Sequence, residues 1–232
     1  METQSFRLYD CTAKVVVLEN GKVFCRILHE KDRWTIGRKT PENSPDIALS
    51  SPIASRNHGE LLCIDGQWLY CYRGSLNPTY HNGKRIRAGL NGRAAPVSLS
   101  SGDVIRIDTD NLDMPDVNGV LLLFVNDCSD ENWSYISCQE AAETFFGRDD
   151  TACQIVLHDP FVSRKHACIV ALNGQYYLSD CNSKDGTKLN GRTISSTELL
   201  REKDKISISD YSFIFTGRGV LFCGNIKNSS TG

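Results

Sequence analysis

Long apolar stretches are missing from this sequence of 232 residues. No apolar run is longer than residues 120–125, which is far shorter than the roughly 20 residues that a helix needs to cross a bilayer. The segment Met1–Ser5 has neither the basic start nor the apolar core of a secretory signal. We therefore expect no membrane insertion by this chain and a cytoplasmic location.

A charge excess of either sign is also missing. The chain has 26 Lys and Arg residues against 28 Asp and Glu residues, a formal net charge of −2. A dominant role at nucleic acid or at a membrane surface needs a clear basic excess. We therefore expect no nucleic-acid partner. A near-neutral net charge does not exclude local basic pockets.

Cysteine is plentiful, with 10 residues, but close pairs of the Cys-x-x-Cys kind are absent. Without such pairs a structural zinc site is disfavoured, and without a secretory signal a disulfide framework is disfavoured. We expect no metal and no cofactor. Free cysteine packs as a small apolar residue, and five cysteines in strand-like runs are expected to do so: Cys25, Cys63, Cys71, Cys168 and Cys223.

Established catalytic motifs are absent as well. The sequence has no Gly-x-Ser-x-Gly elbow, no Gly-x-x-x-x-Gly-Lys-Ser/Thr phosphate loop and no His-Glu-x-x-His zinc motif. A Ser-Arg-x-His element places a hydroxyl and an imidazole three residues apart, but no orienting carboxylate recurs with it. We therefore expect no catalysis.

What the sequence does contain is an internal repeat. Gly37-Arg38, Ser55-Arg56-Asn57-His58 and Asn82-Gly83 recur as Gly147-Arg148, Ser163-Arg164-Lys165-His166 and Asn190-Gly191. Residues 47–86 align with a second copy at a constant offset of 108, and the Gly-Arg pairs align at an offset of 110. A fixed period of this kind indicates a duplicated module.

Short apolar runs separated by turn residues predict an all-β fold. Asn20-Gly21, Asp65-Gly66 and Asn173-Gly174 each stand between two such runs and suit type I′ hairpin turns. Regularly spaced short strands favour a β-sandwich, formed twice. We expect one domain at residues 1–126 and a second at residues 127–232, with residues 225–232 as a frayed polar tail.

At these anchors the sequence resembles the forkhead-associated (FHA) domain family. The second copy matches more closely, through Phe146-Gly147-Arg148, Ser163-Arg164-Lys165-His166 and Asp185-Gly186-Thr187. The two copies cover nearly the whole chain. The resemblance implies two sandwiches of about eleven strands each, whose loops at one end bind phosphothreonine peptides.

Phosphothreonine carries about −1.5 to −2 charges and three acceptor oxygens, so its receptor needs several fixed donors, and arginine supplies a planar fork of them. Carried over by motif, the phosphopeptide-binding residues are Arg38, Ser55, Arg56, Asn77, Arg148, Ser163, Arg164, Lys165, Lys184 and Asp185. Structural roles are expected for Gly37, His58, Asn82, Gly83, Gly147, His166, Asn190 and Gly191. A surface Gly-Arg that is only a turn with a solvated charge is the alternative.

The two copies depart from the family pattern in different ways. The first keeps an anchoring asparagine, Asn77, but has Leu76 and Pro78 beside it. The second has Asp185 at the anchoring position, and an ionised carboxylate accepts hydrogen bonds without donating them. Lys184 offsets part of that charge. We therefore expect the first copy to bind phosphothreonine more tightly.

The expected partner is a threonine-phosphorylated protein or peptide, with a Ser/Thr kinase upstream. The alternative is a scaffolding pair of FHA-like domains that has lost phosphate binding. Under this alternative the chain could be the cytosolic regulatory part of a larger protein such as an ABC transporter. A separate hypothesis makes Thr3, once phosphorylated, a ligand of the chain's own sites.

Overall fold

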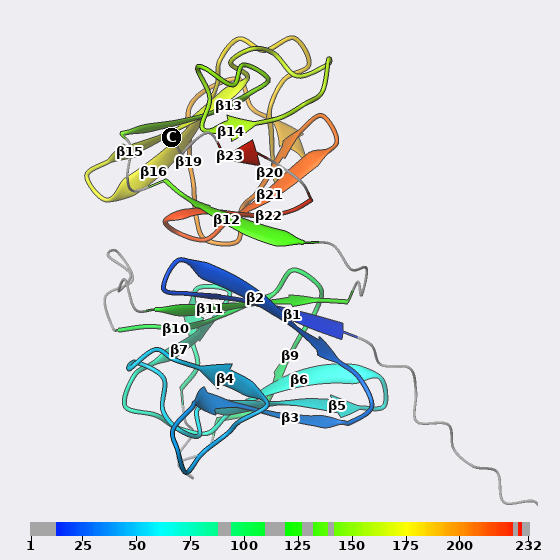
Figure 1. Ribbon diagram of the computed structural model, residues 1–232, viewed down its shortest axis with the longest axis vertical. Coiled ribbons are helices and arrows are strands. Elements are labelled where there is room, and N and C mark those ends of the chain that lie inside the picture. The colour runs from blue at the N-terminus through cyan, green and yellow to red at the C-terminus, as the bar shows by residue number, and fades with distance from the viewer. Residues whose placement is uncertain are drawn as a thin grey trace, which may run out of the picture. The chain divides into compact units, whose positions relative to one another are not determined.

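The computed structural model describes residues 13–87, 94–109, 119–126, 132–138, 142–224 and 227–228. These residues form strands β1–β23 and no helix, and they divide into two compact units (Figure 1). Strands β1–β11 build the first unit and β12–β23 the second. The all-β prediction is confirmed.

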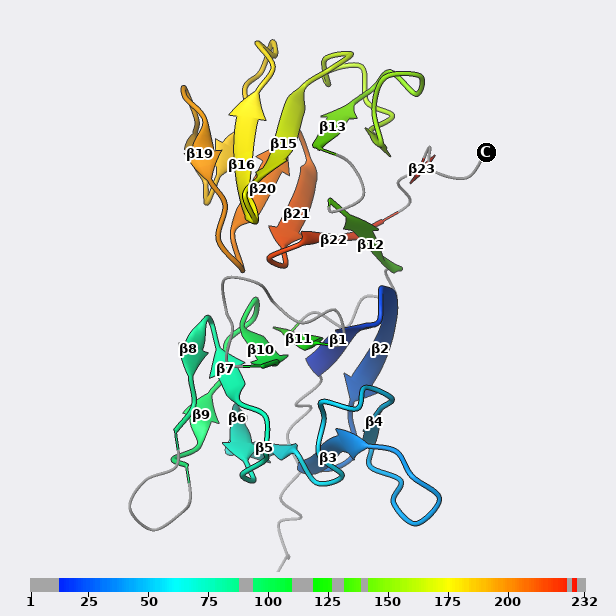
Figure 2. The ribbon, with the colours of Figure 1, turned by 90° about the vertical axis from the view of Figure 1, so that its left-hand side faces the viewer.

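The first unit is a sandwich of two sheets, ordered β2-β1-β11-β10-β7-β8 and β4-β3-β5-β6-β9 (Figures 1 and 2). Strands β3 and β4 pair in parallel, and the other neighbouring strands with an assigned register are antiparallel. The strands are β1 (Ala13–Glu19), β2 (Lys22–Leu28), β3 (Arg33–Arg38), β4 (Ile47–Leu49), β5 (Gly59–Ile64), β6 (Gln67–Tyr72), β7 (Thr79–His81), β8 (Lys84–Arg85), β9 (Val97–Ser98), β10 (Val104–Ile107) and β11 (Val120–Val125).

The second unit repeats this plan, with sheets ordered β12-β22-β21-β20-β17-β18 and β19-β16-β15-β13-β14-β23. Here β13 and β14 form the parallel pair. The strands are β12 (Trp133–Ser137), β13 (Glu143–Gly147), β14 (Ile155–Val156), β15 (Ala167–Leu172), β16 (Gln175–Asp180), β17 (Lys188–Leu189), β18 (Arg192–Thr193), β19 (Glu198–Leu199), β20 (Lys205–Ile208), β21 (Tyr211–Phe215), β22 (Gly219–Cys223) and β23 (Lys227–Asn228).

The expected hairpin turns are present in both units. Asp65 and Gly66 have φ values of 49° and 82°, and Asn173 and Gly174 have 51° and 76°. Two successive positive φ values are the signature of a type I′ turn, which asparagine, aspartate and glycine tolerate best. The same local chemistry therefore closes the same hairpin in each copy.

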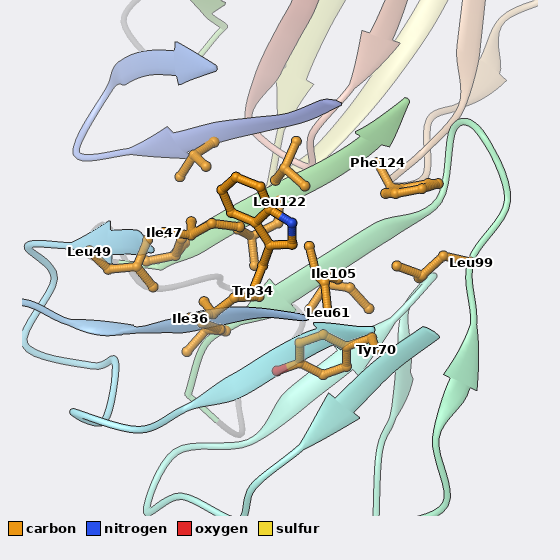
Figure 3. Packing of buried hydrophobic residues seen from close by; sticks show 14 of the residues in the cluster. Trp34, Ile36, Ile47, Leu49, Leu61, Tyr70, Leu99, Ile105, Leu122 and Phe124 are labelled. Atoms are coloured by element: carbon orange, nitrogen blue, oxygen red, sulfur yellow. The ribbon is translucent and has the colours of Figure 1, made fainter. Parts of the chain in front are cut away.

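Each sandwich closes over its own apolar core. In the first unit, Ile36 and Tyr70 of one sheet face Ile105 and Phe124 of the other, and all four are at most 2% exposed (Figure 3). The core of the second unit is likewise drawn from both of its sheets. Alternate residues along a strand point into these cores, as Trp68 and Tyr70 of β6 do.

Two expectations need correction. Cys25 is exposed on the edge strand β2, so it does not pack as a core residue. The polar tail is not wholly frayed, because Lys227–Asn228 form β23 and pair with β14.

Other expectations remain predictions. Thr3 and residues 127–131, next to the predicted domain boundary, lie outside the described residues. Within the described ranges, no helix is long and apolar enough to cross a membrane.

Candidate functional site

The Gly-Arg motif ends β3 of the first unit and brings it against the Ser55–Arg56 turn. A Cβ atom at position 37 would overlap the Arg56 carbonyl, so only glycine permits this approach. The Arg38 amide donates to the Ser55 carbonyl over 2.9 Å. The motif residues Arg38 and Ser55, 17 positions apart in the sequence, therefore share one backbone contact.

The second unit builds the same contact. A Cβ atom on Gly147 would overlap the Arg164 carbonyl, and the Arg148 amide donates to the Ser163 carbonyl over 3.1 Å. The duplicated motif therefore produces a duplicated backbone frame.

A fully buried histidine supports the serine turn in each unit. The His58 ring accepts the Ser55 amide at Nδ1 over 3.2 Å, so its Nε2–H donates to the Thr79 hydroxyl over 2.8 Å. Burial lowers the pKa of His58 to about 4, which keeps the ring neutral at pH 7. His166 accepts the Ser163 amide in the same way and donates to the Gly186 carbonyl over 3.2 Å.

An asparagine that the sequence did not single out clamps the first site. The Asn43 amide donates to the Arg38 carbonyl over 3.1 Å and to the Arg56 carbonyl over 2.8 Å. Its counterpart in the second unit is Cys153, whose thiol donates to the Arg164 carbonyl over 3.2 Å. The equivalent carbonyls of Arg56 and Arg164 thus accept from a side-chain amide in the first frame and from a thiol in the second.

A carboxylate fixes the start of the serine turn in each unit. Buried Glu19 of β1 accepts the amides of Ser50 and Ser51, the latter over 2.6 Å. In the second unit, Asp159 accepts the Ser209 hydroxyl over 2.8 Å and the Phe161 amide over 2.8 Å. Neither carboxylate was predicted: Glu19 acts through contacts that are remote in sequence, and Asp159 combines a local bond to Phe161 with a bond to Ser209, 50 positions away.

In the first unit, the loop after β6 reaches back to the serine turn. Asn77 donates its side-chain amide to the Ile53 carbonyl over 2.9 Å. The Ser75 amide donates to the Tyr72 hydroxyl over 2.9 Å. The predicted peptide anchor Asn77 therefore also ties two loops together.

The corresponding loop of the second unit uses a different network. Asp180, at the position of Tyr72, accepts the amide of Ser183 over 2.8 Å and the hydroxyl of Thr187 over 2.6 Å. Burial raises the pKa of Asp180, but hydrogen bonds from these residues outweigh it and hold the pKa below its usual value. The Lys184 amide donates to the Ser163 hydroxyl over 3.1 Å, which brings this loop to the site.

Both key arginines have uncommitted side-chain donors. Arg38 Nε is buried and has no hydrogen-bond partner, and neither Arg38 nor Arg148 forms an ion pair with any residue that the structure describes. The Ser55 hydroxyl is likewise uncommitted among described residues. A buried donor without a partner is costly, so the arrangement suits an anion.

The remaining predicted binding residues lie at the surface. Arg56, Arg164 and Asp185 are exposed, and the side chain of Asp185 has no partner in the described ranges. Lys165 places its ammonium 4.2 Å from the centroid of the Phe145 ring. Lys165 therefore forms a cation–π interaction with Phe145.

The Asn-Gly turns complete the predicted structural set. Asn82 and Asn190 adopt φ values of 49° and 51°, followed by Gly83 and Gly191 at 76° and 81°. The Asn82 amide donates to Asp103 over 2.8 Å, and the Asn190 amide donates to Asp204 over 2.8 Å. No group of acidic, histidine or cysteine side chains with metal-binding geometry occurs within the described ranges.

Comparison with solved structures gives partial matches. Mycobacterium tuberculosis EmbR, in complex with a low-affinity phosphopeptide, is 36% identical over 34% of this chain and 20% of that chain, with a TM-score of 0.32. The N-terminal FHA domain from S. cerevisiae Rad53p, in complex with a phosphothreonine peptide, is 21% identical over 49% of this chain and 92% of that chain, with a TM-score of 0.40. The N-terminal FHA domain from EssC, a component of the bacterial Type VII secretion apparatus, is 12% identical over 94% of this chain and 95% of that chain, with a TM-score of 0.37.

No curated protein matches the chain. The sequence model of the FHA domain, by contrast, matches residues 34–108 and 144–209, which together make up more than half of the chain. The two matches fall on the two units and include both Gly-Arg and both Ser-Arg-x-His motifs. This chain belongs to the FHA domain family and carries the domain twice.

Proposed function

We propose that this chain is a non-catalytic module that binds threonine-phosphorylated peptides. The observation that carries the proposal is the uncommitted Arg38 side chain beside the Ser55 turn, with Arg148 and Ser163 in the same frame. Family membership supports a phosphopeptide ligand. A Ser/Thr kinase would then act upstream, and a cytoplasmic location would suit such signalling.

The uncommitted donors are of the kinds that bind phosphate. A guanidinium supplies a planar fork, and each serine supplies a short hydroxyl donor. The Ser163 oxygen already accepts from the Lys184 amide, which leaves its proton available to an anion. Lys184 itself is exposed beside Ser163 and adds a second positive charge in that unit.

Preorganisation supports binding further. The close approach at Gly37 or Gly147, the hydrogen bond to His58 or His166, and the Asn43 or Cys153 bond fix each frame through residues other than the proposed phosphate ligands. A receptor fixed in this way loses little conformational entropy when it binds.

The test is binding of a degenerate phosphothreonine peptide library to the intact chain, with unphosphorylated and phosphoserine libraries as controls. We expect selective retention of the phosphothreonine pool and its loss in the double variant Arg38→Ala, Arg148→Ala. Equal retention of phosphorylated and unphosphorylated pools would refute phosphate recognition. Equal retention of the phosphoserine pool would refute the preference for threonine.

A second candidate applies to the second unit. Asp185 adds a negative charge to its loop, which disfavours a phosphate dianion. Under this alternative the second unit is a scaffold, and the pair serves as the regulatory part of a larger protein such as an ABC transporter. Persistence of all phosphopeptide binding in Arg148→Ala would support it.

A further inference from the structure

Each unit exposes one large apolar side chain beside its site, but at positions that do not correspond. Leu76 in the loop after β6 is 99% exposed, and its counterpart in the second unit is Lys184. Phe161, two residues before Ser163, is 66% exposed, whereas its counterpart Ile53 is 8% exposed in the core.

The backbone on both sides of Leu76 is held in place. Ser75 is bonded to the Tyr72 hydroxyl, and Asn77 is bonded to the Ile53 carbonyl two residues before Ser55. The leucine side chain therefore projects from a fixed turn and contributes nothing to the core. An exposed apolar group on a fixed frame gains free energy only when a ligand covers it.

Phe161 is held in a similar way. Its amide donates to Asp159, which also accepts the Ser209 hydroxyl. The next residue, Val162, is 1% exposed and belongs to the core. The aromatic ring is thus presented from a backbone that is anchored on both sides.

We propose that the two units read different peptides. The first selects an apolar residue through Leu76, and the second selects an apolar residue at another distance from the phosphothreonine through Phe161. This inference rests on the proposed function. Leu76 follows β6 and Phe161 precedes β15, so the two side chains occupy different places around equivalent Arg–Ser frames.

The cation at the Leu76 position strengthens the difference. An apolar peptide side chain placed there would meet leucine in the first unit and the charged Lys184 in the second. Dehydrating an ammonium against an apolar group is unfavourable. Lys184 therefore excludes from the second unit the peptides that Leu76 favours in the first.

The test uses intact chain with one site disabled. Arg148→Ala leaves the first site and Arg38→Ala leaves the second, and each is given a phosphothreonine library with randomised flanking positions. We expect apolar enrichment at one flanking position for the first site and at a different position for the second.

Leu76→Ser is added to the Arg148→Ala background and Phe161→Ser to the Arg38→Ala background. Each should remove that enrichment and lower the affinity for the selected peptide by about five-fold. The same variants should change the affinity for an alanine-flanked phosphothreonine peptide by less than about two-fold. That change is smaller than the effect of burying one methylene group. Leu76→Met, which keeps an apolar side chain, should retain the enrichment.

Three results would overturn this inference while leaving phosphothreonine recognition intact. These are enrichment at the same position in both backgrounds, enrichment that survives the serine variants, and binding confined to one unit. A chain that does not prefer the phosphorylated library in either background refutes the proposed function instead.

Discussion

The two units keep the same backbone frame but fix it with different side chains. Asn43 joins the Arg38 and Arg56 carbonyls in the first unit, whereas in the second unit the Cys153 thiol donates to the Arg164 carbonyl. Where two backbones touch, both copies retain glycine. Divergence is therefore tolerated where a carbonyl needs a donor, and is not tolerated where no side-chain volume is available.

The loop after β6 teaches the same lesson. Tyr72 and Asp180 occupy one position, and both accept the amide of the corresponding serine, Ser75 or Ser183. A neutral hydroxyl and a carboxylate thus serve one structural purpose. Only the carboxylate brings a negative charge toward the proposed phosphate site. We therefore expect the first unit to bind phosphopeptides more tightly.

The arginine variants separate the two units most strongly. Removing one partner of a buried charge pair costs about 2–5 kcal/mol, so Arg38→Ala should weaken a selected phosphopeptide by roughly 30-fold or more. Isothermal titration of the intact chain measures this, with Arg26→Ala of β2 as the control. Loss of binding in Arg148→Ala alone would reverse the ranking of the two units.

The glycine variants should destabilise the two units by equal amounts. Gly37→Ala and Gly147→Ala each force a methyl group into a backbone carbonyl, which should lower the free energy of unfolding by ~3 kcal/mol. Denaturant unfolding monitored by circular dichroism measures the loss. Gly21→Ala is the control, since its Cβ meets no atom within 4 Å and only its positive φ of 71° opposes alanine. A loss at Gly37→Ala no larger than at Gly21→Ala would disprove the close approach.

Acid should act on the first unit through His58. The unfolded ring has a pKa near 6.5, so the unfolded state binds a proton before the folded state, whose pKa is about 4. Stability that is complete above pH 6.5 is therefore lost as the pH falls toward 4, by about 2 kcal/mol at pH 5. Unfolding of the intact chain and of His58→Gln at pH 7 and pH 5 measures the difference. A decline of equal size in the variant would assign the effect to other groups.

Exchanging the side chains at positions 43 and 153 carries the smallest expected effect. It should weaken binding by one unit and strengthen binding by the other. Asn43→Cys removes one of two hydrogen bonds, each worth about 1 kcal/mol, and should weaken phosphopeptide binding by the first unit about three- to five-fold. Cys153→Asn should strengthen the second unit by a similar factor. Affinities are measured in the Arg148→Ala and Arg38→Ala backgrounds, with exposed Glu42→Gln as the control. Unchanged affinity in both variants would show that the clamp has no influence on binding.

Much of the fold could be predicted because its signals are local. The turns at Asp65-Gly66 and Asn173-Gly174, and the apolar runs beside them, specify hairpins without reference to the rest of the chain. The repeat adds the pairing of motifs, since two copies with the same spacing fold alike. Short contributions from the chain end, such as β23, have no such signal.

The support of the site was harder to predict because its contacts are remote. Glu19 meets Ser50 and Ser51 across more than 30 positions of sequence, and no spacing rule connects them. Asn43 and Cys153 correspond only at the offset of 110 that aligns the Gly-Arg pairs, outside the ungapped alignment of residues 47–86. Extending that larger offset past the motif would have paired them.

The pairing of β1 with β11 has a consequence for the order of events during synthesis. Lys14 lies opposite Val125, so the pairing of β1 with β11 cannot form until nearly the whole first unit has left the ribosome. At about 5–20 residues per second, β1 waits on the order of ten seconds for its partner. The second copy's β12 waits in turn for β22, through the pairing of Trp133 with Cys223. The first sandwich thus has its own last strand before its duplicate emerges, and this timing limits mispairing between two copies whose strands resemble each other.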